Sequence, residues 1–129
     1  MARNTARGTR CEMVLCAELR RMRLRFSRNV ASLPGKPDIV FVEQQVAVFC
    51  DGDFWHGRKW SVRKGRLARG SNAKYWVSKI EANVARDKRH RAKLRRAGWR
   101  IIRLWESDIL KDPEVAAGKV LDALVLRQD

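Results

Sequence analysis

Acidic side chains stand where two neighbouring apolar runs of this sequence begin or end. Asp38 follows Pro37 and opens the run DIVFV, and Asp51 directly follows the run VAVFC. A hairpin of two such strands brings both carboxylates to one edge of a sheet, beside a main-chain carbonyl. Oxygen ligands of this kind suit Mg²⁺, which polarises a phosphodiester and supplies hydroxide near neutral pH. The pattern predicts a Mg²⁺ site at Asp38 and Asp51, with two ordinary turn aspartates as the alternative.

Further polar residues are suited to proton transfer near this site. His56 lies five residues after Asp51, and an imidazole titrates near neutral pH, so it can exchange a proton with water. Asn83 and Asp87 are one helical turn apart inside an apolar stripe, and a polar pair that faces a core must be hydrogen-bonded. They are expected either to orient an active-site group such as His56 or to form a structural pair that includes an Asp87–Arg91 salt bridge.

Two aromatic residues, Phe54 and Trp55, stand between the acidic strand end and His56. Consecutive side chains of an extended segment point to opposite sides, so burying both rings at a strand end is difficult. Exposed rings in a basic loop stack on bases or wedge between base pairs and kink the duplex. The pair is therefore expected either to contact DNA bases or to pack in the core.

The charge balance of the chain is strongly basic. Lys and Arg number 29 against 14 Asp and Glu, so the formal net charge is +15. A field of this sign attracts polyanions, so nucleic acid or an anionic membrane is the expected partner. The segment from Arg86 to Arg103 contains nine Lys or Arg, both end residues included, which favours a face that follows DNA phosphates over a merely solvated helix face.

Other features bear on the compartment. No apolar run approaches the ~20 residues that a membrane span needs, so no membrane-spanning segment is expected. Of the two polyanionic partners, double-stranded DNA is expected and a membrane is not. Three cysteines, Cys11, Cys16 and Cys50, have no CxxC spacing, and reduced thiols are the simplest interpretation. We therefore expect a cytoplasmic, nucleoid-associated protein.

The periodicity predicts one α/β domain with a mixed sheet and helices on its faces. Residues 1–8 lack apolar periodicity and are expected to form a flexible basic arm before a domain over residues 9–129. Thr9 and Glu12 have capping-box spacing at the start of the first helix. The remaining elements are expected to be strands at 24–30, 38–42 and 46–50, a basic loop at 57–70, a helix at about 72–97, a strand at 99–105, and a helix beginning at Pro113 after the cap Asp112.

Three segments carry a family resemblance. LPGKPDIVF, VAVFCDGDFWHG and YWVSKIEANVARDKRHRAKLRRAGWRIIRLWE resemble, in order and spacing, the very short patch repair (Vsr-like) DNA mismatch endonucleases, over about residues 9–112. The resemblance implies a restriction-endonuclease-like fold of the PD-(D/E)XK type. It also implies Mg²⁺-dependent nicking of duplex DNA beside T:G mismatches, with other repair proteins as further candidate partners.

The same resemblance assigns roles to individual residues. Asp38 matches an essential metal-binding aspartate, Cys50 a residue whose carbonyl binds the metal, and His56 the catalytic histidine. Asp51, a further candidate for catalysis and metal binding, falls where some members have histidine and others aspartate. Glu12, the remaining catalytic candidate, matches an acid of the first helix near the site. Asn83 and Asp87 match helix residues behind it. The residues expected to contact DNA are Lys36, Phe54, Trp55, Trp76, Arg86, Lys88 and Arg89.

Some positions depart from the family pattern. Asp53 and Ser107 stand where well-known members have cysteine zinc ligands, so the family's zinc site is expected to be absent. Asp51 stands where some members have histidine, which removes a scheme with two catalytic histidines. The expected function is Mg²⁺-dependent nicking of duplex DNA at T:G mismatches. The alternatives are a catalytically inactive DNA-binding module, a broader restriction or defence nuclease of the same fold, or an RNA-binding protein.

Overall fold

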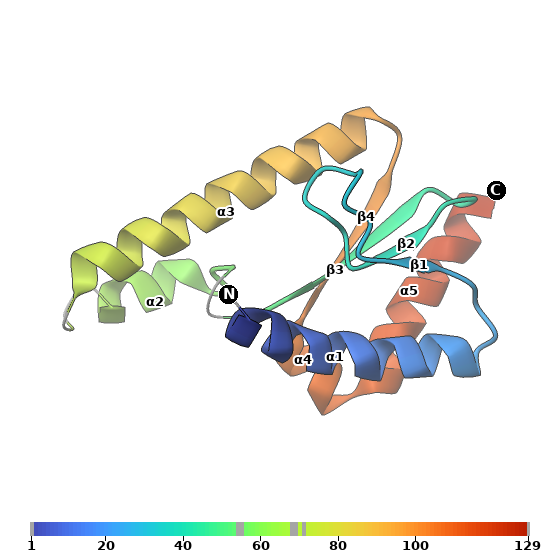
Figure 1. Ribbon diagram of the computed structural model, residues 1–129, viewed down its shortest axis with the longest axis horizontal. Coiled ribbons are helices and arrows are strands. Elements are labelled where there is room, and N and C mark those ends of the chain that lie inside the picture. Colours follow the sequence, from blue (N-terminus) through green and yellow to red (C-terminus); the bar gives the residue numbers. More distant parts are fainter. Residues whose placement is uncertain (1, 54–55, 68–69, 71, 129) are drawn as a thin grey trace.

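The structure is a computed structural model that describes residues 2–53, 56–67, 70 and 72–128. Figure 1 shows the arrangement of its helices and strands. In chain order they are α1 (Ala2–Arg21), β1 (Ser27–Arg28), β2 (Ile39–Phe41), β3 (Val46–Asp51), α2 (Trp60–Leu67), α3 (Ala73–Arg96), β4 (Arg100–Trp105), α4 (Glu106–Lys111) and α5 (Pro113–Gln128).

The strands form one mixed sheet in the order β1-β2-β3-β4. β2 pairs antiparallel with β3, with Ile39 opposite Val48, and this confirms the expected hairpin. β4 joins the other side of β3 in parallel, with Asp51 opposite Trp105. The ends of β3 and β4 therefore lie side by side, next to the start of β2, and the loop after β3 leaves from this edge.

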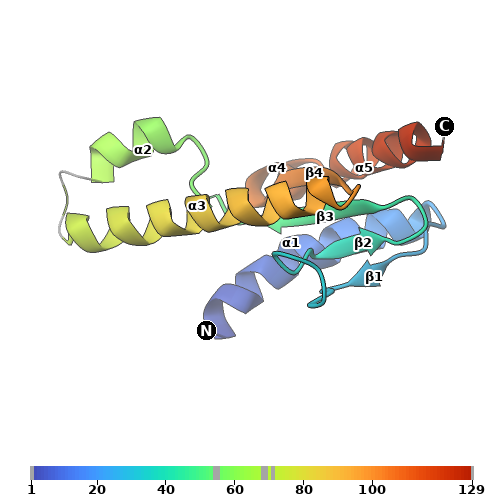
Figure 2. The same ribbon diagram turned by 90° about the horizontal axis from the view of Figure 1, so that it is seen from above.

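Helices cover both faces of the sheet (Figure 1). α1, α4 and α5 lie on one face, and the buried side chains between them and the sheet include Leu15, Leu19, Val48, Leu104 and Val120. α3 lies on the other face, and its first half extends beyond the sheet with α2 beside it (Figures 1 and 2). The domain is thus an α/β sandwich of helices around a four-stranded sheet. None of the described helices is long and apolar enough to span a membrane.

The ends of two helices follow from local sequence signals. Gly98 has φ +93°, its N–H donates to the carbonyl of Arg95 at 3.0 Å, and the N–H of Trp99 donates to that of Leu94 at 3.0 Å. This pattern is a Schellman motif, which needs a residue such as glycine at the left-handed position. At α5, the N–H of Val115 donates to Asp112 Oδ1 at 3.2 Å, so the expected cap is confirmed.

Several expected elements were wrong. α1 begins at Ala2, so residues 2–8 continue the helix and the capping box at Thr9 and Glu12 does not exist. β1 has only two residues, and α4 directly follows β4 where no helix was expected. The differences at β1 and α4 concern short segments, in which tertiary packing outweighs local propensity.

The expected loop at 57–70 contains the helix α2. Two contacts to Glu81 of α3 hold it in place. Trp60 Nε1 donates to Glu81 Oε2 at 3.3 Å, and Lys64 forms an ion pair with the same oxygen at 2.7 Å. A basic segment that contains a glycine, here Gly65, can therefore be helical when a neighbouring helix supplies an acidic partner.

Candidate active site

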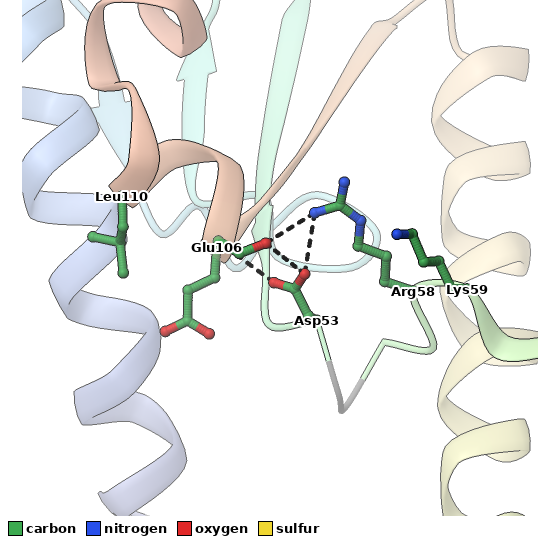
Figure 3. Close-up of a pocket in the computed structure, with 6 residues that line it drawn as sticks. Asp53, Arg58, Lys59, Glu106 and Leu110 are labelled. Atoms are coloured by element: carbon green, nitrogen blue, oxygen red, sulfur yellow. Dashed lines mark hydrogen bonds and ion pairs between the residues drawn. The ribbon is translucent and has the colours of Figure 1, made fainter. Parts of the chain in front are cut away.

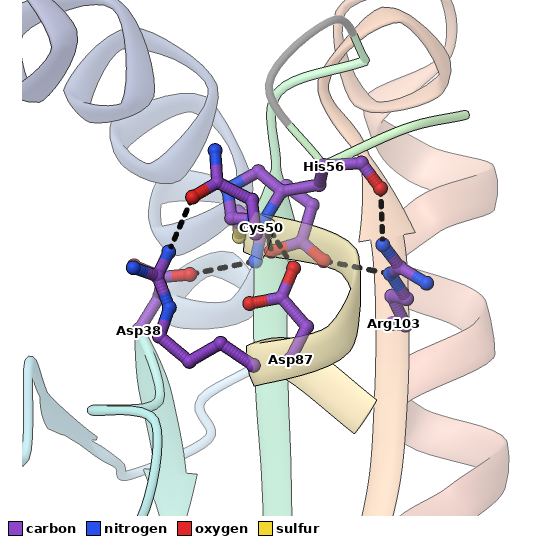
Figure 4. Close-up of polar contacts among 8 residues, drawn as sticks. Asp38, Cys50, His56, Asp87 and Arg103 are labelled. Atoms are coloured by element: carbon purple, nitrogen blue, oxygen red, sulfur yellow. Dashed lines mark hydrogen bonds and ion pairs between the residues drawn. The ribbon is translucent and has the colours of Figure 1, made fainter. Parts of the chain in front are cut away.

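The start of β2 and the end of β3 bring Asp38 and Cys50 into contact. The N–H of Asp38 donates to the Val48 carbonyl at 3.0 Å, and the N–H of Cys50 donates to Asp38 Oδ2 at 2.7 Å (Figure 4). The Cys50 side chain points into the core and is 8% exposed. The Asp38 carboxylate is therefore fixed beside the backbone of the strand end.

Asp38 lies in an environment that disfavours its negative charge. Burial raises its pKa from the usual value of 3.8 to about 7, although the hydrogen bond from Cys50 acts in the opposite direction. The nearby charges of Glu12 and Asp51 raise the pKa further. Clustered carboxylates that repel one another in a partly buried site leave a position that favours a cation.

His56 is held by a carboxylate of α3. His56 Nδ1 lies 2.6 Å from Asp87 Oδ2, and Figure 4 shows the two side chains facing each other. Burial alone would lower the pKa of His56, but the hydrogen bond with Asp87 and the charge of Asp51 outweigh it and raise the pKa. Burial would likewise raise the pKa of Asp87, but the contact with His56 lowers it. Asp87 therefore orients the imidazole, which was one of the two interpretations of its position.

The loop that carries His56 approaches α3 closely. Gly57 has φ +73°, and a Cβ at this position would lie 2.5 Å from Val84 Cγ2. Only glycine fits such a backbone conformation and contact without strain. The close approach brings the neighbouring His56 within reach of Asp87, one turn further along α3.

Asn83 and Asp87, which were expected to act as a pair, contact different residues. Asn83 Oδ1 accepts a hydrogen bond from Arg86 Nη2 at 3.1 Å. The two polar residues of the α3 stripe therefore differ in their contacts, and a role of Asn83 in orienting His56 stays a prediction.

Arg103 is a site residue that the sequence interpretation missed. Its Nε donates to Asp51 Oδ2 at 2.7 Å, and its Nη2 donates to the His56 carbonyl at 3.0 Å. Asp51 is 5% exposed, and its Oδ1 lies 3.9 Å from His56 Nδ1. An arginine within the apolar strand WRIIRLW was the available signal, because a charged residue among buried neighbours requires a partner.

One triad of ligand atoms in the described part of the chain could hold a metal ion. Asp51, His56 and Asp87 each offer one atom, and these atoms lie within 4.8 Å of one another. Asp38 is outside this triad. The triad is already linked by the His56–Asp87 hydrogen bond and by the ion pair of Asp51 with Arg103.

Glu12 is buried near Asp38 and has an arginine partner. It is 5% exposed, and its Oε2 accepts from Arg28 Nε at 3.0 Å and from Arg28 Nη2 at 2.7 Å. Its charge is one of those that raise the pKa of Asp38. Glu12 therefore does not cap the helix, as was expected from the sequence spacing, and instead lies beside the site.

The described residues that were assigned to DNA contact lie in the turn before β2 and on α3. Lys36 is exposed in the turn before β2, and Arg86, Lys88 and Arg89 are exposed on α3. Trp76 is half-buried, and its ring lies 5.0 Å from that of Tyr75 in an edge-on arrangement. Phe54 and Trp55 lie outside the described residues. Contact of all these residues with DNA stays a prediction.

Asp53 and Ser107 form a polar cluster at the base of the His56 loop. Asp53 Oδ1 accepts from the Ser107 N–H at 3.0 Å, and Oδ2 accepts from the Ser107 hydroxyl at 2.6 Å. Arg58 donates to Asp53 and Ser107 at 3.1 and 2.9 Å and pairs with Asp108 at 3.1 Å. Burial would raise the pKa of Asp53, but Ser107 and Arg58 together lower it. These contacts attach the loop to the junction of β4 and α4.

An open pocket of about 530 Å³ lies beside this cluster. Figure 3 shows it between the His56 loop and the start of α4. Its lining residues are Asp53, Arg58, Lys59, Glu106, Ser107 and Leu110. The lining mixes acidic and basic groups, so it selects neither anions nor cations by charge alone.

A proton-transfer group set beside clustered carboxylates is suited to the hydrolysis of a phosphodiester, which is the reaction of a nuclease. The chain belongs to the Vsr family, since the family model described as DNA mismatch endonuclease Vsr matches residues 1–62 and curated relatives extend the match over most of the chain. It is a nicking endonuclease, a phosphodiester hydrolase. The family implies a restriction-endonuclease-like fold.

Three relatives illustrate the extent of the similarity. The type II nicking enzyme V.NmeDIP of Neisseria meningitidis serogroup C is 38% identical over 124 residues, which cover 96% of this chain and 82% of that protein. The type II nicking enzyme V.HpaIIP of Haemophilus parainfluenzae is 40% identical over 94% of this chain and 84% of its own length. The DNA mismatch endonuclease Vsr of Escherichia coli (strain K12) is 37% identical over 78% of this chain and 62% of its own length.

Proposed function

We propose that this protein is a Mg²⁺-dependent endonuclease that nicks one strand of duplex DNA beside a T:G mismatch, as in very short patch repair. Membership of the Vsr family supports the reaction. The observation that carries the metal dependence is the contact of the Asp38 carboxylate with the Cys50 backbone, among the charges of Glu12 and Asp51.

The donor atoms at this position fit a hard divalent cation. Both backbone groups of a strand residue point to the same neighbouring strand, so the Cys50 carbonyl faces the side on which Asp38 lies. Asp51 Oδ2 is held by Arg103, so Oδ1 is the oxygen through which Asp51 would reach the ion. Mg²⁺ takes few protein ligands and prefers oxygen, and when bound it would polarise the scissile phosphate.

The protein side chains then supply proton transfer and binding. His56 Nδ1 is engaged by Asp87, so Nε2 is the atom that exchanges a proton with the attacking water or the leaving oxygen. Exposed basic residues of α3, among them Arg86 and Arg89, would hold the DNA backbone. Phe54 and Trp55 would insert beside the mismatch.

Plasmid nicking tests the reaction and its metal requirement. Wild-type protein with Mg²⁺ should convert supercoiled plasmid to the open circle, and EDTA should prevent it. Asp38→Ala should abolish nicking and leave DNA binding nearly unchanged. A wild-type protein that binds duplex DNA and never nicks it would instead be the catalytically inactive module, and one that prefers RNA at fixed salt would be an RNA-binding protein.

A second candidate function is nicking at matched sites in a restriction or defence system. The names of several relatives favour it, because V.NmeDIP and V.HpaIIP are both called type II nicking enzymes. Two oligonucleotide duplexes that differ only in a T:G or a T:A pair separate the candidates. Preferential nicking of the T:G duplex supports mismatch repair, and equal nicking of both supports the second candidate.

A further inference from the structure

Arg103 connects the end of β3 with the loop that carries His56. It lies on β4 opposite Phe49 of β3 in the parallel register. Its side chain donates one hydrogen bond to the last residue of β3, Asp51, at 2.7 Å. It donates another to the backbone carbonyl of His56 at 3.0 Å (Figure 4). A single guanidinium therefore joins the strand end to the loop that carries the catalytic histidine.

The orientation of this guanidinium is fixed by an aromatic ring. The Arg103 guanidinium carbon lies 4.2 Å from the centroid of the Trp105 ring, two residues further along the same strand. Stacking of this kind stabilises a planar cation, and the rigid fork of donors loses little freedom when it binds two acceptors. A lysine at this position could not stack and donate to both oxygens in the same way.

The burial of Asp51 explains why a fixed cation is needed there. Asp51 is 5% exposed, and its distance of 3.9 Å from His56 is too long for a hydrogen bond. Loss of Arg103 would leave a buried carboxylate without its cation, which is strongly unfavourable. The same loss would release the His56 backbone from β4.

We propose that Arg103 is a positioning residue for strand cleavage, because its contacts with Asp51 and with the His56 carbonyl hold the His56 ring against Asp87. The imidazole is then fixed from two sides, with its backbone bound to β4 and its Nδ1 bound to α3. The expected effect of Arg103 on the nicking rate rests on the proposed function. The expected effect of Arg103 on the position of the His56 ring rests on the geometry alone.

The kinetic test compares Arg103→Ala with the matched control Arg21→Ala, which removes an arginine that pairs with Glu18 at 3.5 Å on the exposed surface of α1. Single-turnover nicking at saturating DNA should slow about 10²-fold in Arg103→Ala, because a misplaced catalytic group costs about that much. The DNA concentration at half-saturation should change little. Guanidinium chloride at millimolar concentration should restore part of the rate, and equal NaCl should not. Arg21→Ala should resemble the wild type throughout.

A spectroscopic test does not depend on activity. The chain has two histidines, so proton NMR in water can separate the imidazole N–H signals of His56 and His90. The strong His56–Asp87 hydrogen bond should give a low-field N–H signal in the wild type and in Arg21→Ala. Arg103→Ala should lose or broaden this signal, whereas the His90 signal should stay. Absence of nicking in the wild type would overturn the proposed function and leave this test intact.

Three results would overturn the role of Arg103. One is an unchanged His56 signal in folded Arg103→Ala. Another is an Arg103→Ala variant that nicks saturating DNA at the wild-type rate and differs only in the DNA concentration at half-saturation. That result would make Arg103 a DNA contact. If Arg103→Ala does not fold, Arg103→Lys keeps the charge and reaches only one acceptor. It should then fold and nick at a rate below wild type, and a full rate in Arg103→Lys would also contradict the proposal.

Discussion

His56 Nδ1 and Asp87 Oδ2 lie 2.6 Å apart, across 31 residues of sequence. A carboxylate in this position stabilises the protonated ring and fixes which nitrogen faces the substrate. The pair joins the loop after β3 to the middle of α3, so the relative position of these two segments decides whether His56 can act.

Asp87→Asn should remove the negative charge beside His56 while it keeps the hydrogen bond to Nδ1. The amide can still accept a hydrogen bond from Nδ1, but it no longer stabilises the imidazolium. Because Asp87 raises the pKa of His56, the variant should lower that pKa, and nicking should fall about 10²- to 10⁴-fold. NMR titration of the two histidines measures the shift, with His90 as the internal control. An unchanged His56 midpoint would contradict the electrostatic role of Asp87.

The raised pKa of Asp38 predicts how stability depends on pH without metal. Its pKa of about 7 in the folded protein exceeds the ordinary value of 3.8, so the folded state binds more protons between these values. This contribution to stability is fully present below about pH 4 and is lost as the pH rises through about 7, by up to about 4 kcal/mol at pH 8.

Asp38→Asn should therefore raise the thermal midpoint of the metal-free protein at pH 8 and have little effect at pH 4. Added Mg²⁺ should stabilise the wild type at pH 8 because it binds the ionised carboxylate, and it should not stabilise the variant. Thermal unfolding with and without Mg²⁺ measures both effects. Asp122→Asn, at an exposed position of α5, is the control. Equal midpoints for Asp38→Asn and wild type at pH 8 would show that the folded protein does not destabilise the ionised carboxylate of Asp38.

Gly57 offers a test of the close packing between the His56 loop and α3. Gly57→Ala places a methyl group 2.5 Å from Val84 Cγ2 at a residue with φ +73°. The substitution should destabilise the protein by about 1–3 kcal/mol and should slow nicking because His56 moves away from Asp87. Gly65→Ala in α2 is the matched control, since nothing lies within 4 Å of the added carbon. It should be neutral or stabilising, and a larger effect at Gly65 than at Gly57 would exclude this packing argument.

The sequence allowed the sheet edge to be predicted better than the contacts around it. Asp38 and Asp51 were expected at one edge because hairpin strands of similar length align their ends. β2 is shorter than β3, but the antiparallel register, with Ile39 opposite Val48, still places Asp38 beside the end of β3. Arg103 was missed because its partner Asp51 is 52 residues away, and the parallel register that brings them together is not visible in local periodicity.

The helices show the same division between local and distant causes. The Schellman motif at Gly98 and the cap at Asp112 are local signals, and both ends were predicted. α2 was expected as a loop because its stabilising partner, Glu81, belongs to another helix. Likewise the capping box at Glu12 satisfied a local rule, but the side chain instead pairs with Arg28 of β1. Sequence rules predicted the helix ends that depend on neighbouring residues. They did not predict the contacts around the candidate active site, because most of these join residues that are far apart in the sequence.

The hydrogen-bonded cluster of Asp53, Arg58 and Ser107 stands where the family resemblance would put cysteine ligands of zinc. Because Asp53 and Ser107 bond directly to each other, the loop should need no zinc. Protein stripped of metal with EDTA and then given Mg²⁺ alone should recover full nicking. Ser107→Ala should lower the unfolding free energy by about 0.5–1 kcal/mol, since it removes hydroxyl hydrogen bonds, and Ser78→Ala at an exposed site of α3 should not. Recovery that requires added Zn²⁺ would show that the loop is held by a metal rather than by this cluster.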